Sequence, residues 1–344
     1  MDDARPVAAH FDSTANAWVL STHADVSAAL RDARLSPSAS SNAATVPTGV
    51  RQAAARAFSP DKLALWRAEI EQSAAGYAAR LSVGQPVDLV SEFAAPWSLA
   101  LAMKATRAAG EDATRLAALA RDVFLAAAHS TDSAVPQSAL AASLELAATL
   151  QNATTEASLD VQAFVALAHT LPGFLAGAWL ELFGNAEAAD RLRRNRGLMP
   201  GAIEELLRLA GPSRAVFRVA LSDVAIGAAR IRPGERVALM LAAANRDPAL
   251  FADADRFDPE RHADQHLAFG KGTHSCVGAS MIRMAAAAAT GALLSATANV
   301  KLIGEIDWVE GFAIRAPSSL YATLEREPPD ASHSQNSQRP VPIT

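Results

Sequence analysis

The chain of 344 residues carries a formal net charge of -5, and half of its residues are hydrophobic while 19% are charged. This composition is ample for a globular core, and the lack of a basic run argues against nucleic-acid binding. Positions 1–30 contain neither a signal-peptide core nor a membrane-spanning apolar run, so no membrane association is predicted. A single cysteine gives no disulfide framework. We therefore expect a cytoplasmic protein, with one domain over residues 1–326 and a polar, disordered tail over 327–344.

A strand and a helix are predicted near the N-terminus. The run Ala17-Trp-Val-Leu is a short apolar segment typical of a strand, and Asp25-Val26 opens a helix that continues to Leu30. Residues 35–49 are rich in Ser, Ala, Pro and Thr, so we expect a loop there.

Several helices should follow between residues 61 and 150. Apolar residues recur there at helical spacing, and the pattern breaks at 84–86 and near Pro136. No residue pattern in this span indicates chemistry, so the sequence does not identify the substrate.

Residues 161–183 form an apolar helical stretch that contains His169, Thr170 and Pro172. Proline lacks an N–H and clashes with the carbonyl four residues earlier, here that of Ala168, so a kink is predicted at this point. At such a kink His169 and Thr170 could face a bound ligand as an acid, a base or a proton donor. Alternatively, His169 lies on the helix surface or in the core, and Pro172 simply breaks the helix.

The next segment combines an ion pair with short strands. Glu205 and Arg208 are three residues apart on one helical face, close enough to pair. Apolar clusters predict strands at three places, with a tight turn between the second and third: strands at 216–219, 224–226 and 236–240, and the turn at 232–234.

The only cysteine, Cys276, lies in a glycine-rich loop just before a helical segment. Free backbone N–H groups and the dipole at a helix N-terminus favour a thiolate, so the sulfur is poised to bind a metal. Gly270, Gly272 and Gly278 allow backbone conformations that other residues resist, and they let the chain lie against a flat group. His274 can donate a hydrogen bond to an anionic group at the edge of such a ring. Together these features indicate haem held by one axial thiolate.

Two other interpretations of Cys276 compete with haem ligation. A lone cysteine in an intracellular protein is usually a small buried hydrophobic residue. A structural zinc site would need four Cys or His ligands, and the chain has no second cysteine.

The spacing of the loop favours haem, because the run Phe269-Gly-x-Gly-x-His-x-Cys-x-Gly resembles the haem-binding loop of the cytochrome P450 family. The resemblance is dense from about residue 200 to 321 and patchy before. It implies a mainly α fold with small β-sheets, a cytochrome P450-like fold. It also implies haem b with Cys276 as the iron ligand and four further loop residues around it: Phe269, Gly270, His274 and Gly278.

The resemblance extends to the haem carboxylates and to the N-terminus. Arg218 and Arg51 match the family's arginines that contact these carboxylates, but Pro47 stands where the family usually has a histidine. The segment around Trp18 resembles a family segment that usually has several dozen more residues before it, so an N-terminally trimmed fold is expected. Arg261 resembles a second arginine donor to Glu205.

The helix over the haem departs from the family pattern, in which an acidic residue precedes the threonine. Here His169 precedes Thr170, and Leu167 replaces a glycine, which we expect to narrow the groove. Both His169 and Thr170 are candidate catalytic residues.

Three functions follow from the resemblance. The first is a monooxygenase that acts on a small-molecule substrate and receives electrons from separate ferredoxin and reductase proteins. The second is a haem-thiolate enzyme that does not use dioxygen: a peroxygenase, dehydratase, isomerase or cyclase. The third is a haem-binding accessory protein without turnover, suggested by the missing histidine.

Overall fold

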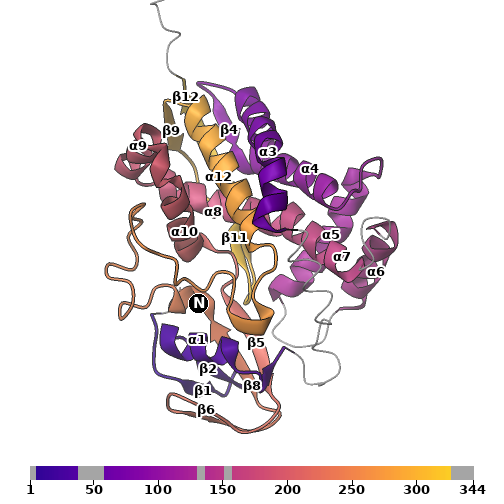
Figure 1. The fold of residues 1–344 in the computed structure, drawn as a ribbon, viewed down its shortest axis with the longest axis vertical. Coiled ribbons are helices and arrows are strands. Elements are labelled where there is room, and N and C mark those ends of the chain that lie inside the picture. The colour runs from indigo at the N-terminus through magenta and orange to yellow at the C-terminus, as the bar shows by residue number, and fades with distance from the viewer. Residues whose placement is uncertain (1–4, 38–57, 130–135, 151–156, 327–344) are drawn as a thin grey trace, which may run out of the picture.

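The computed structural model describes residues 5–37, 58–129, 136–150 and 157–326, which are mainly helical with small β-sheets, as predicted. Helices fill the upper part of Figure 1 around α12 (Ala279–Ala296), and the largest sheet and α1 (His23–Arg31) form the lower part. The other α-helices are α3 (Pro60–Arg80), α4 (Ala95–Ala105), α5 (Ala113–His129), α6 (Gln137–Leu150), α7 (Ala157–Val165), α8 (Leu171–Phe183), α9 (Ala186–Arg194), α10 (Met199–Ala210) and α11 (Leu241–Ala244). Shorter helical turns are the π turns η1 (Val90–Ala94) and η2 (Ala166–Thr170) and the 3-10 turns η3 (Arg196–Leu198) and η4 (Gly272–His274).

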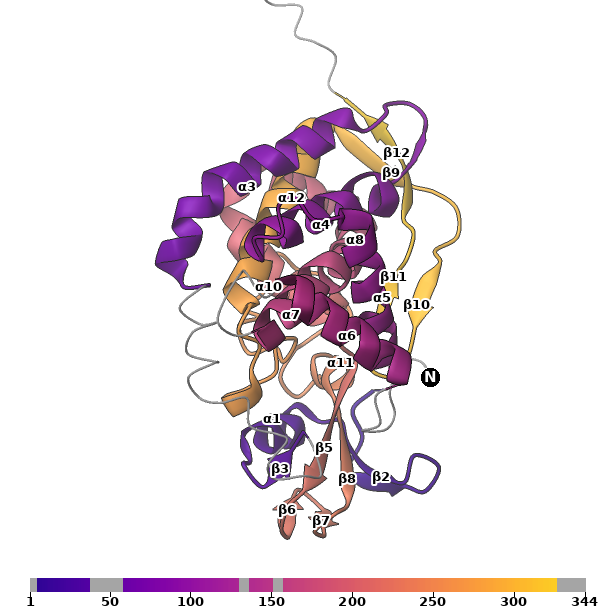
Figure 2. The same ribbon diagram turned by 90° about the vertical axis from the view of Figure 1, so that its right-hand side faces the viewer.

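The five-stranded and the three-stranded sheets of the described chain lie at opposite ends of the molecule (Figure 2). The five-stranded sheet has the order β1-β2-β8-β5-β3, with β2 and β8 parallel and the other neighbours antiparallel. Its strands are β1 (His10–Asp12), β2 (Ala17–Leu20), β8 (Arg236–Met240), β5 (Ala215–Ala220) and β3 (Leu35–Ser36). The three-stranded sheet contains β4 (Pro86–Asp88), β12 (Tyr321–Glu325) and β9 (Asn299–Leu302). The two-stranded sheets of the described chain are β6 (Val224–Ile226) with β7 (Ala229–Ile231) and β10 (Trp308–Glu310) with β11 (Arg315–Pro317).

The predicted N-terminal strand and helix are confirmed as β2 and α1. The Thr22 side chain caps α1 by accepting a hydrogen bond from the Asp25 N–H at 3.2 Å. The predicted loop at 35–49 was wrong at its start, because Leu35 is buried and pairs with Ala220 of β5 as strand β3. Residues 38–49 lie outside the described chain.

The irregularity predicted near Pro172 is present as the π turn η2 between α7 and α8. The Leu171 N–H donates to the Ala166 carbonyl, five residues back, in place of the usual four. Pro172 lies in the first turn of α8, a position where proline is common.

Buried apolar side chains form two clusters in the described chain. The larger cluster fills the helical part and includes Trp97, Trp179 and Phe93. The smaller one lies between α1 and the five-stranded sheet and includes Leu20 and Leu239.

Two helical stretches of the described chain are long and apolar enough to cross a membrane, Asp160–Phe183 and Ala279–Ala296. Core helices pass the same test of length and composition. Both stretches contribute to the large apolar cluster, with 67% and 50% of the respective apolar windows buried.

Candidate haem site

A buried ion network stands behind the cysteine loop. Glu205 accepts hydrogen bonds from Arg208 at 2.7 and 2.8 Å and from Arg261 at 2.9 Å, which confirms the predicted pairing. Arg208 also donates to the Asn245 carbonyl at 2.8 Å, and the Asn245 side chain accepts from the Leu267 N–H at 2.6 Å. The Glu205 and Arg208 side chains are fully buried, so this network fixes the backbone just before the loop.

Backbone hydrogen bonds and two left-handed glycines shape the cysteine loop itself. The Cys276 N–H donates to the Phe269 carbonyl at 2.8 Å, which closes the loop next to the sulfur. Gly270 and Gly272 have φ values of +64° and +72°, which favour glycine as predicted. Gly278 differs, since its φ of -87° is open to any residue, and it serves as the N-cap of α12. Cys276 therefore lies one turn before a helix N-terminus, as expected.

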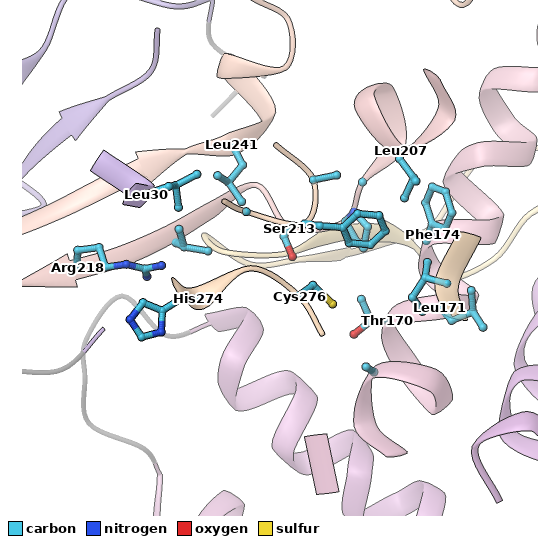
Figure 3. Close-up of a pocket in the computed structure, with 18 residues that line it drawn as sticks. Leu30, Thr170, Leu171, Phe174, Leu207, Ser213, Arg218, Leu241, His274 and Cys276 are labelled. Atoms are coloured by element: carbon cyan, nitrogen blue, oxygen red, sulfur yellow. The ribbon is translucent and has the colours of Figure 1, made fainter. Parts of the chain in front are cut away.

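The loop forms one wall of a pocket that encloses about 860 Å³ of space, including its solvent-facing mouth. In Figure 3, Arg218 and His274 lie at one end, Phe174 and Leu171 at the other, and Cys276 and Thr170 between them. Most of the lining side chains are apolar. The full lining is Leu30, Ala166, Thr170, Leu171, Phe174, Leu207, Gly211, Pro212, Ser213, Val216, Arg218, Leu241, Ala268, Phe269, Gly270, His274, Cys276 and Ile282.

Arg218 is a buried cation at the wall of this pocket. It is only 7% exposed, and its guanidinium donates to the Phe217 carbonyl at 2.7 Å. Burial lowers the pKa of Arg218, and no carboxylate of the described residues pairs with it. A buried charge without a counter-ion is costly unless a ligand supplies one. A flat apolar group with carboxylates at one edge, such as haem, therefore fits this pocket.

The structure brings most of the predicted site residues to one pocket. Six of them line it: Thr170, Arg218, Phe269, Gly270, His274 and Cys276. Gly278 follows the loop without lining the pocket. Arg51 and Pro47 lie outside the described residues. Among the described residues, no group of three or more His, Cys, Asp or Glu side chains is arranged to hold a metal ion.

The structure does not bring His169, a predicted catalytic residue, to the pocket. Its Nε2 lies 2.9 Å from the Ala117 carbonyl on α5, and its ring stacks on Phe124 with centroids 5.7 Å apart. Leu167 is buried in the large core, so it does not narrow the groove as expected. Ala166 and Thr170, four residues apart on one helical face, line the pocket instead.

The apolar wall residues were missed by the sequence analysis. Leu30 comes from α1, Val216 from β5 and Leu241 from α11, and no local pattern marks them as neighbours. Only the full topology places these three side chains at one cavity.

A polar cluster next to Phe269 was also missed. Glu204 accepts hydrogen bonds from Arg283 at 2.6 and 2.8 Å and from the Nε2 of His266 at 3.2 Å. The Arg283 guanidinium lies 4.7 Å from the centre of the Phe269 ring. Burial raises the pKa of Glu204, but the hydrogen bonds from His266 and Arg283 outweigh burial and lower the pKa to about 2. The sequence signal for this cluster was the acidic residue Glu204 next to Glu205. Spacing alone could not identify His266 and Arg283 as its partners.

Comparisons with known proteins agree with this geometry. The family described as "Cytochrome P450" matches residues 182–296. The "Biotin biosynthesis cytochrome P450" of Bacillus subtilis is 37% identical to this chain over a matched region. That region covers 45% of this chain and 40% of the relative's length. The "Cytochrome P450 107B1" of Saccharopolyspora erythraea is 31% identical over 76% of this chain and 70% of its own length.

Solved structures share the fold. The LnmA cytochrome P450 hydroxylase of Streptomyces atroolivaceus superposes with a TM-score of 0.76 and 26% identity, covering 89% of this chain and 90% of its own. This chain matches "Cytochrome P450 107B1" over most of both chains. It also shares the fold of solved cytochrome P450 structures and contains the cysteine loop. The chain belongs to the cytochrome P450 family.

Proposed function

We propose that this chain is a monooxygenase in which Cys276 holds haem b and a small organic molecule is oxidised beside Thr170. The observation that carries the proposal is one pocket lined by the Cys276 sulfur, the buried Arg218 guanidinium and Thr170. The family implies haem with a cysteine thiolate as the iron ligand. When bound, such haem supplies the electron-transfer and oxygen chemistry.

The residues of the chain have separable roles in this proposal. Arg218 and His274 bind the haem carboxylates at one end of the pocket through charge-assisted hydrogen bonds, which are stronger than neutral ones. Arg51 is proposed as a second arginine for the same carboxylates. Phe269 and Gly270 shape the loop that presents the sulfur, and Gly278 caps the helix that follows the loop. The Thr170 hydroxyl donates or relays a proton toward the reacting group, because it faces the same pocket as Cys276.

The substrate proposed is neutral and mostly apolar. Leu171, Phe174 and Val216 line the pocket, and Ser213 adds one hydroxyl. Apolar walls exclude water and orient a ligand through few polar contacts. The similarity to a hydroxylase of the leinamycin biosynthetic pathway supports a substrate of the secondary-metabolite kind.

The wider setting is also proposed. Residues 1–326 would form one haem-binding unit in the cytoplasm, while the tail predicted at 327–344 lies outside the described residues. Electrons would come from separate ferredoxin and reductase proteins. The acid–base alternative without dioxygen loses its main support, because His169 does not line the pocket.

The test compares Thr170→Ala with the wild type in a dioxygen-dependent turnover assay. We expect less product for each equivalent of reductant, because the hydroxyl that delivers protons is gone. Thr170→Ser should keep most of the coupling. Thr149→Ala, on α6 with its hydroxyl on the Glu145 carbonyl, is the matched control and should change nothing. Product formation that needs no dioxygen, or unchanged coupling in Thr170→Ala, would reject the proposal.

A further inference from the structure

His169 is held by a different helix from the one that carries it. Its Nε2 lies 2.9 Å from the carbonyl oxygen of Ala117 on α5. Because a carbonyl only accepts, Nε2 must carry the proton and donate. The ring also stacks on Phe124, with an interplanar angle of 26°. His169 thus joins η2 to α5 by a directed hydrogen bond and a ring contact.

The charge state of His169 suits a fixed donor. Burial lowers the pKa of His169, the hydrogen bond to Ala117 opposes this, and Arg121 lowers the pKa further. The neutral imidazole has one N–H, and that N–H is committed to α5. For His169 to transfer a proton at the pocket, this N–H would have to point into the pocket instead of to α5.

The acceptor helix is itself held in place. Phe124 is buried, and the Ala128 carbonyl near the end of α5 accepts a hydrogen bond from the Ala313 N–H at 3.2 Å. Ala313 lies in the turn between β10 and β11. The C-terminal end of α5 is therefore tied to this turn, so α5 can serve as a reference point for η2.

This anchor fixes the orientation of the π turn η2. A π turn, with its i to i+5 hydrogen bond, is uncommon; it occurs mostly as a single turn inside α-helices and is frequent at functional sites. Consecutive side chains on this turn point in different directions, so when His169 is directed to α5, Thr170 is directed to the pocket.

We propose that His169 is a positioning residue: it anchors the π turn Ala166–Thr170 to α5 and thereby directs the Thr170 hydroxyl into the pocket. This inference rests on the role proposed above for Thr170. It assigns His169 no contact with substrate or haem.

The test uses two variants of the haem-loaded protein. His169→Phe keeps a ring against Phe124 but has no donor, whereas His169→Gln keeps an N–H that can reach the Ala117 carbonyl. Backbone hydrogen exchange over residues 166–171 should speed up about two- to ten-fold in His169→Phe, the range expected for losing one hydrogen bond. It should return toward the wild-type rate in His169→Gln. His129→Phe, at the exposed end of α5, is the control for replacing an imidazole by a phenyl ring.

A second readout separates positioning from mere structural support. Product per reductant should fall in His169→Phe and recover in His169→Gln. In a Thr170→Ala background, His169→Phe should cause no further loss, because the two residues act as one unit. Unchanged exchange in His169→Phe, or a full additional loss in the double variant, would overturn the inference. Faster exchange with unchanged coupling in Thr170→Ala would instead reject the role of Thr170 and leave the anchor standing.

Discussion

Arg218 carries a positive charge at a buried position where no carboxylate of the described residues compensates it. Such a group lowers the stability of the ligand-free fold. Binding of an anionic ligand removes this cost, so the group strengthens ligand binding. The sequence identified Arg218 through its resemblance to a family position. Its burial and lack of a counter-ion could not be predicted, because both depend on what packs around β5.

Replacing Arg218 should therefore have opposite effects on the two forms of the protein. In Arg218→Met, haem should be lost roughly 10- to 100-fold faster, since a charge-assisted hydrogen bond contributes about 1.5–3 kcal/mol. The haem-free chain should keep or increase its free energy of unfolding. Haem transfer to an acceptor protein and urea unfolding measure the two quantities. Arg230→Met, at an exposed position on β7, is the control. A destabilised haem-free chain with unchanged haem loss would show that Arg218 is structural.

Glu204 gives a residue-scale prediction in pH. Its folded-state pKa of about 2 lies below the ordinary value of 4.5. Its contribution to stability is therefore present above pH 4.5 and is lost as the pH falls toward 2. Glu204→Gln should be less stable than wild type at pH 7, and the difference should shrink between pH 4.5 and 2. Urea unfolding across this range measures it, with Glu145→Gln of the surface pair to Arg115 as the control. A constant difference would contradict the prediction.

At the scale of elements, the helix α8 depends on glycines where other elements approach it. A Cβ on Gly173 would lie 2.6 Å from the Cβ of Ala316 on β11, which is closer than two non-bonded carbon atoms can approach. A Cβ on Gly177 would lie 3.2 Å from that of Ala210 on α10. These contacts place α8, and with it η2, against the wall of the pocket.

Two glycine-to-alanine changes should have opposite effects on the free energy of unfolding. Gly173→Ala should lower the free energy of unfolding by about 1–3 kcal/mol, the usual cost of overpacking. Gly76→Ala, inside α3 with nothing within 4 Å of the added carbon, should raise it by about 0.5–1 kcal/mol because alanine favours a helix. Denaturant unfolding of both variants checks this. Equal effects would mean that α8 and β11 are packed less closely than described.

The sequence predicted elements well where the signal is local. The helical spacing between 61 and 150, the break at Pro172 and the turn at 232–234 were all confirmed. Strand β3 was missed because Leu35 pairs with Ala220, far along the chain. The side-chain direction of His169 was also beyond a local pattern, since a π turn shifts the face that each residue presents.

At the scale of the whole molecule, the pocket lies where the two apolar clusters meet. Leu30 and Leu241 belong to the smaller cluster beside the sheet, while Leu171 and Phe174 belong to the larger helical one. A flat group bound there would contact both parts of the fold. The cysteine loop was predictable because its ten residues are contiguous, whereas the opposite wall is assembled from separate elements.

The most direct test of the central claim, haem ligation by the Cys276 thiolate, is the absorption spectrum of the reduced, carbon monoxide-bound protein. The comparison is between wild type, Cys276→Ala and the control Ser280→Ala on α12. We predict the spectrum typical of thiolate-ligated haem in the wild type and in Ser280→Ala, and its loss in Cys276→Ala with the helical content largely kept. A thiolate-type spectrum that persists in Cys276→Ala, or that is missing from the haem-loaded wild type, would contradict the account.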